Sequence, residues 1–121
     1  MGAKHFKETT VYRKAFSLAM EVFEITKSFP KEEKYSLTDQ MRRSSRSVCT
    51  NIGEGYRKKR YVAHFVSKIT DSDAENTETG VWLDFSSACE YISPSDYARL
   101  SKESEEVGKL LNHMIEHPEL Y

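Results

Sequence analysis

The chain has 121 residues, a length that suits one domain with a core of limited size. Charged residues make up 31% of it and apolar residues 38%, a globular composition rather than that of a disordered chain. The net charge of −1 excludes a protein that attracts polyanions through its total charge, so any such attraction must be local.

The first predicted helix covers about residues 10–28. Its apolar residues recur at spacings of three and four, which is typical of a helix packed in a bundle. Thr9 or Thr10 is placed to cap its start. Phe29-Pro30 ends it, because the residue before a proline avoids the helical region. The seam consists of Val11, Ala15, Leu18, Val22, Ile25 and Phe29, and it is widened by Phe16, Ala19 and Phe23.

The second predicted helix covers about residues 37–56 and follows a short charged connection. Its inward positions include Ser44 and Ser45, and such small residues permit the close approach of a neighbouring helix. Gly53 and Gly55 weaken its end, so we expect the break somewhere in 53–60. The seam consists of Leu37, Met41, Ser45, Val48 and Ile52.

The third and fourth predicted helices cover about residues 61–91 and 95–117. Ser93 or Ser95 is placed to cap the fourth, with Pro94 in or beside its first turn. No segment alternates like a strand, so the chain predicts an all-α protein, a single antiparallel up-down four-helix bundle over residues 1–121. The third seam runs through Val62, Phe65, Ile69, Ser72, Asn76, Val81, Leu83 and Phe85, and the fourth through Tyr97, Leu100, Ser104, Val107, Leu111 and Met114.

Charge is unevenly distributed along the chain. Residues 42–60 contain seven Lys or Arg and one acid, whereas residues 71–96 contain seven acids and no Lys or Arg. One interpretation is that the cations hold a nucleic-acid backbone, without any base-reading motif. The alternative is that Arg42 or Arg43 pairs internally and residues 57–60 form a solvated loop. The candidate nucleic-acid contacts are Arg42, Arg43, Arg46, Arg57, Lys58, Lys59 and Arg60.

The polar middle of the third helix faces the second if the two are antiparallel. Positions that sum to about 118–120 then oppose one another, which places Arg43 near Glu75 and Arg46 near residues 72–73. We interpret this region as an interhelical network that fixes register. The alternative, a metal site like that of di-iron bundles, lacks the required histidine. The candidate network comprises Arg43, Asn51, Glu54, Ser72, Glu75 and Glu78.

Other signals for chemistry are incomplete. His113 and His117 belong to an H-x-x-E-H pattern, but Pro118 ends the helix and nothing marks a third metal ligand. Cys49 and Cys89 are expected to be small core residues rather than nucleophiles. We therefore expect no enzyme activity, metal, cofactor or small-molecule substrate.

The expected location is the cytoplasm, with both thiols free, because two cysteines make no disulfide framework. No apolar run approaches the roughly 18–20 residues that span a bilayer. Residues 1–7 lack the apolar segment of a signal peptide. We therefore expect no membrane partner.

The order and spacing of several motifs give the chain a family resemblance. It resembles the small bacterial four-helix-bundle proteins encoded within intervening sequences of 23S ribosomal RNA genes, also called the S23 family. The motifs are Phe29-Pro30-Lys31-Glu32-Glu33-Lys34-Tyr35, Leu37-Thr38, Gln40-Met41-Arg42-Arg43-Ser44, Ser47-Val48, Asn51-Ile52, Glu54-Gly55-Tyr56, and then Phe65, Ser72, Glu75 and Glu78.

This resemblance implies a non-enzymatic bundle that assembles as a ring, commonly a homopentamer. A distant relative of similar fold, the accessory protein of diversity-generating retroelements, works with a reverse transcriptase and nucleic acid. The implied partners are other copies of the chain and RNA, DNA or a nucleic-acid-processing protein. The alternative is a structural module whose basic and acidic faces serve self-assembly alone. Gly53 replaces the usual alanine of the family, which predicts a looser end to the second helix.

Overall fold

The structure is a computed structural model that describes residues 5–121. Residues 1–4, which the single-domain and signal-peptide expectations include, lie outside the described part. Within residues 5–121 there are four long helices, three short 3-10 helices and no strand. The long helices are α1 (Thr10–Thr26), α2 (Leu37–Arg57), α3 (Val62–Ala88) and α4 (Pro94–Glu116), and the 3-10 helices are η1 (Phe6–Glu8), η2 (Lys31–Glu33) and η3 (Pro118–Leu120).

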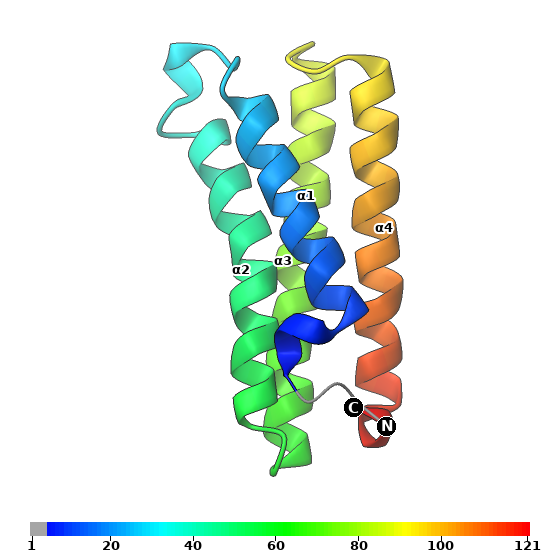
Figure 1. The fold of residues 1–121 in the computed structure, drawn as a ribbon. Coiled ribbons are helices and arrows are strands. Elements are labelled where there is room, and N and C mark those ends of the chain that lie inside the picture. The colour runs from blue at the N-terminus through cyan, green and yellow to red at the C-terminus, as the bar shows by residue number, and fades with distance from the viewer. Residues whose placement is uncertain (1–4) are drawn as a thin grey trace.

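The long helices form a four-helix bundle. In Figure 1, α1 and α3 ascend while α2 and α4 descend, so sequential helices are antiparallel. Both α1 and α3 pack against α2 and against α4. The all-α four-helix prediction is therefore confirmed. The loop between α2 and α3 and the end of α4 lie together at the bottom of the bundle.

The helix ends follow local capping rules. Thr9 accepts a hydrogen bond from the Tyr12 N–H at 3.2 Å, and Ser93 accepts one from the Asp96 N–H at 3.0 Å. The helix α3 ends at Ala88, earlier than the predicted residue 91. Glu90 takes the left-handed conformation with φ 61°, and its own N–H and that of Tyr91 donate back to the carbonyls of Ser87 and Ser86 at the end of the helix.

Two glycines near the end of α2 permit close packing. The helix continues through both and ends at Arg57, inside the predicted interval. A Cβ on Gly53 would lie 3.2 Å from the Phe6 ring, and one on Gly55 would lie 3.1 Å from Cδ1 of Ile69. The absent side chain at Gly53 makes room for an aromatic ring, and the looser end predicted there stays a prediction.

The interior has two apolar clusters. The seams of α1, α2 and α4 supply most of their buried residues, as the sequence predicts. The lower cluster contains Val11, Ala15, Val48, Cys49, Ile52, Phe65, Ile69, Val107, Leu111 and Met114. The upper cluster contains Leu18, Val22, Phe29, Leu37, Met41, Leu83, Ile92 and Leu100.

A layer of buried polar side chains lies between the two apolar clusters along the length of the helices. The hydroxyls of Ser44 and Thr79 lie 2.8 Å apart across α2 and α3. The hydroxyl of Ser72 donates to the Val48 carbonyl at 2.8 Å, which also joins α3 to α2. These bonds satisfy the buried polar groups, so the polar middle of α3 belongs to the interior of the bundle.

Four residues assigned to the seams are exposed instead. Val81 and Phe85 lie two residues either side of buried Leu83, and a helix turns about 100° per residue, so neither can share its face. Both side chains point to solvent. The exposed fractions are 49% for Phe16, 57% for Val62, 42% for Val81 and 53% for Phe85.

Candidate nucleic-acid interface

The side chain of Arg42 is hydrogen-bonded to the end of α1. Its Nε donates to the Thr26 hydroxyl at 2.8 Å, and its Nη2 donates to the Phe23 carbonyl at 3.3 Å. That carbonyl belongs to the last turn of α1, where backbone acceptors lack helical partners and a cation suits the helix dipole. Arg42 therefore holds α1 against α2.

Arg43 is also engaged, but on the opposite side of α2. Its guanidinium pairs with the carboxylate of Glu75 at 3.5 Å and with that of Glu78 on the next turn of α3. The Arg43 side chain is 48% exposed, so each pair contributes at most about 1 kcal/mol to stability. Arg43 lies near Glu75 as the antiparallel register requires.

Arg46 does not lie where the register argument places it. Its guanidinium lies 5.9 Å from the centroid of the Phe23 ring on α1, and the side chain is exposed. The hydroxyl of Ser72 is instead buried and bonded to the backbone of α2. The expected contact between Arg46 and residues 72–73 is therefore wrong, and Arg46 forms no ion pair with another described residue.

The last residue of α2 and the loop to α3 carry four consecutive cations, residues 57–60, which we call the tip loop. No member of it forms an ion pair within residues 5–121. Lys59 lies over the Tyr56 ring, with Nζ 4.6 Å from the centroid. The other three, Arg57, Lys58 and Arg60, are exposed.

The predicted polar network is divided into separate contacts. Glu54 pairs with Lys68 at 2.8 Å, and this hydrogen bond holds the pKa of the Lys68 ammonium above its usual value. Asn51 donates to the Ser47 carbonyl at 2.9 Å within α2 itself. Neither residue reaches Arg43, so the candidate network consists of separate contacts. Three of them join α2 to α3: Arg43 with Glu75 and Glu78, Glu54 with Lys68, and Ser72 with the Val48 carbonyl.

A row of aromatic side chains lies beside α2, and the sequence did not predict it. The ring centroids of Phe6 and Tyr12 lie 5.1 Å apart, and those of Tyr12 and Phe16 lie 6.0 Å apart. Tyr12, Phe16 and Phe23 occupy one stripe of α1, and the periodicity places Phe16 and Phe23 in the buried seam. Because Arg46 lies over Phe23, this stripe borders the cationic side of α2.

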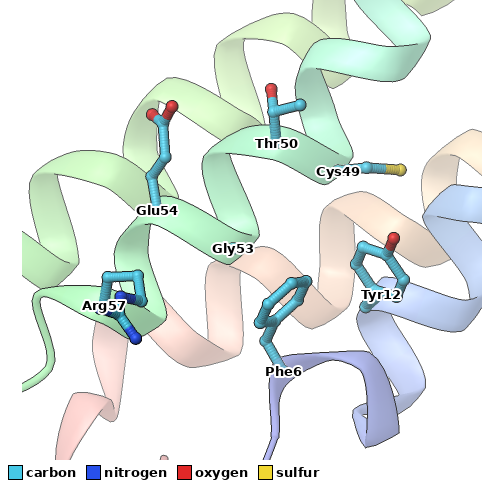
Figure 2. Close-up of a pocket in the computed structure, with 7 residues that line it drawn as sticks. All are labelled: Phe6, Tyr12, Cys49, Thr50, Gly53, Glu54 and Arg57. Carbon is cyan, nitrogen blue, oxygen red and sulfur yellow. The ribbon is translucent and has the colours of Figure 1, made fainter.

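The lower end of this row borders an open pocket of about 400 Å³ (Figure 2). Figure 2 shows the Phe6 ring below Gly53, between Arg57 and Tyr12. Burial raises the pKa of the Tyr12 hydroxyl and raises the pKa of the Cys49 thiol to about 11, so both are neutral near pH 7. The pocket is lined by Phe6, Tyr12, Cys49, Thr50, Gly53, Glu54 and Arg57.

The remaining candidates for chemistry are dispersed. Cys89 is exposed, which corrects its assignment to the core. The Nδ1 of His113 lies 2.6 Å from the Tyr121 hydroxyl. In the described part of the chain, no group of three or more His, Cys, Asp or Glu is arranged to hold a metal ion. Among the same residues, no helix has the length and apolarity that crossing a bilayer requires.

The chain is similar to known proteins over most of its length. Residues 7–113 match the profile of the family described as "23S rRNA-intervening sequence protein". A crystal structure of a protein of unknown function from the S23 ribosomal protein family of Bacteroides thetaiotaomicron superposes with a TM-score of 0.79 at 29% sequence identity, covering 88% of this chain and 95% of that one. No curated protein sequence matches. The chain therefore belongs to the 23S rRNA-intervening sequence protein family.

Proposed function

We propose that this protein is a non-enzymatic helical bundle that self-associates and binds nucleic acid through Arg46 and the tip loop. The supporting observation is that these five cations lack ion-pair partners in the described structure, whereas Arg42 and Arg43 are engaged. Unpaired cations on one side of a bundle replace counterions on a phosphate backbone, and this release drives association. The ribosomal RNA in the family description agrees with such a ligand.

The test compares two sets of cations by fluorescence anisotropy with a labelled structured RNA. Replacing residues 57–60 by serine removes four unpaired charges. We expect binding at least about tenfold weaker and a salt-dependence slope smaller by about 3. Arg43→Gln is the control, because it removes an exposed arginine that is already paired with two carboxylates.

Two results would overturn the proposal. One is an absence of salt-dependent association of the unmodified protein with RNA or DNA near physiological ionic strength. The other is an equal loss of affinity in Arg43→Gln and in the tip-loop variant. Circular dichroism of both variants establishes that the exposed substitutions leave the helices intact.

Self-association has support of its own at the upper end of the bundle. Tyr35 and Phe85, exposed at 84% and 53%, line a pocket of about 380 Å³ together with Trp82. Val81, exposed at 42%, lies one helical turn from Phe85 on α3. Adjacent exposed apolar side chains mark contact surfaces between proteins. This patch is the proposed contact with a second copy, and the family resemblance suggests a pentamer.

Light scattering coupled to size exclusion tests the assembly. The expected mass is a multiple of the 14.0 kDa chain, and Phe85→Lys reduces it. Tyr61→Lys is the control, since Tyr61 is also exposed but lies at the start of α3, at the opposite end. A monomeric unmodified protein, or the same decrease with Tyr61→Lys, would refute the proposed contact.

A further inference from the structure

The pocket beside Gly53 differs from the other surface hollows in its charges. The hollow between α1 and α4 is bordered by Glu21, Glu24, Asp96 and Arg99, and this arginine is already paired with Glu21 and Asp96. The one beside Phe85 has the carboxylate of Glu33 at its rim and no cation. Unlike these two hollows, the pocket of Figure 2 carries an arginine, Arg57, that has no ion-pair partner within residues 5–121.

The walls of this pocket are suited to a flat apolar ring. Phe6 and Tyr12 line it edge-on to one another, with the His5 ring stacked on Phe6, so the aromatic surface lies on the part of these rings that faces the pocket. Gly53 has no side chain between the Phe6 ring and the α2 backbone. The neutral Cys49 thiol adds a weakly polar wall, and its pKa of about 11 leaves it without nucleophilic character near pH 7. The volume of about 400 Å³ lies in the range of small-ligand sites, roughly 300–1,000 Å³. These walls offer apolar and aromatic contact to a bound ring.

The rim adds one acceptor and one cation. Glu54 pairs with Lys68 through Oε1, so its charge is partly balanced while Oε2 remains available to accept a hydrogen bond. Arg57 has no ion-pair partner among residues 5–121 and begins the cationic tip loop. An aromatic ring with N–H donors that is linked to phosphate matches both features, and a nucleotide has this combination.

We propose that this pocket binds one unpaired nucleobase of a nucleic-acid strand whose phosphates lie on Arg57 and the rest of the tip loop. This inference rests on the proposed function and specifies its ligand as single-stranded. Stacked and paired bases in a duplex cannot enter a side pocket without being extruded, whereas a single strand presents its bases freely.

The test measures affinity for a single-stranded oligouridine and for an RNA duplex of equal length. Phe6→Leu keeps apolar volume and removes the ring, and stacking on an aromatic ring is worth about 5- to 100-fold in affinity. We expect a loss of this size for oligouridine and almost none for the duplex. Gly53→Ala, whose Cβ displaces the Phe6 ring, reproduces the effect. Thr77→Ala, an exposed change on α3, leaves both affinities unchanged.

Photocross-linking with a central 5-iodouridine keeps the proposal testable if the variants lose stability. The expected cross-linked residues are Phe6 and Tyr12. If the protein binds neither RNA, the proposed function itself fails. Binding to both RNAs that is insensitive to Phe6→Leu, with cross-links elsewhere, refutes the pocket while the tip-loop function stands. In that case, an aromatic side chain of a protein partner becomes the occupant to test.

Discussion

Asn76 and Ser104 form a reciprocal pair in the polar layer, and truncating them is a quantitative test of how that layer stabilises the bundle. The amide of Asn76 donates to the Ser104 carbonyl at 2.9 Å, and the Ser104 hydroxyl donates to Oδ1 of Asn76 at 3.2 Å. The side chains are almost fully buried between α3 and α4. Gly108 makes room for the amide, because a Cβ there would lie 3.3 Å from Nδ2 of Asn76.

The expected magnitude follows from these contacts. Asn76→Ala removes two hydrogen bonds, each worth about 1 kcal/mol net, and leaves a cavity and an unpaired hydroxyl. We therefore expect a loss of about 2–4 kcal/mol in the free energy of unfolding. Ser104→Ala removes one hydrogen bond and leaves Oδ1 of Asn76 unpaired, for a loss of about 1–2 kcal/mol. The double variant loses less than the sum, by about 1 kcal/mol, because the two side chains interact directly.

Urea unfolding followed by far-ultraviolet circular dichroism measures these values. The chain concentration is held constant, since self-association adds to apparent stability. Thr77→Ala, exposed and next to Asn76, is the control and changes stability by less than about 0.5 kcal/mol. A cost below about 0.5 kcal/mol for Asn76→Ala, or additive effects in the double variant, would refute the view that the paired amide and hydroxyl hold α3 and α4 together.

Three further predictions concern single positions. Glu90→Gly relieves the left-handed φ of 61° that ends α3, so thermal unfolding should show a gain of about 0.5–1 kcal/mol, and a loss would contradict this account. Burial, followed by a hydrogen bond with Glu21, raises the pKa of Glu103 to about 7. Because the pKa of Glu103 is higher in the folded than in the unfolded protein, its contribution to the free energy of unfolding is full below about pH 4.5. This contribution is lost as the pH rises through 7. Glu103→Gln should therefore gain about 1–2 kcal/mol at pH 8 and little at pH 5, and a gain independent of pH would refute the assignment. Exposed Cys89 should react faster with a thiol reagent in the native state than Cys49, whose burial raises its pKa to about 11, and equal native rates would contradict this burial.

Periodicity predicted most of the fold because a buried seam repeats wherever a helix meets one neighbour for several turns. It failed for α3 beyond Gly80, where Val81 and Phe85 have apolar side chains but face solvent. An apolar residue on an exposed helix face can be of the same type as one in the core, so residue type alone does not distinguish the two. Helical geometry relative to Leu83 does distinguish them, because two residues along a helix correspond to a rotation of about 200° around its axis.

The polar layer was harder to predict because the same polar residue types occur in buried and in exposed positions. Ser72, Asn76 and Thr79 are each less than 6% exposed, although the segment reads as a hydrophilic run. Their spacings of four and three place them on the inward face of α3. The spacing of these residues therefore predicts where the polar layer lies. Only the packed structure shows which hydroxyl, amide or carbonyl forms a hydrogen bond with each of them.

The division of the basic cluster shows where sequence reasoning stops. Viewed down α2, Arg42, Arg46 and Arg57 fall within about 60° of one another, whereas Arg43 is rotated about 100° from Arg42. Helical geometry alone thus separates Arg43 from the others. It does not reveal that Arg43 meets the carboxylates of α3, or that the other face meets the aromatic stripe of α1 and a ring from η1. Those contacts decide which cations remain available for phosphate, so the number of arginines in the segment overstates the binding surface.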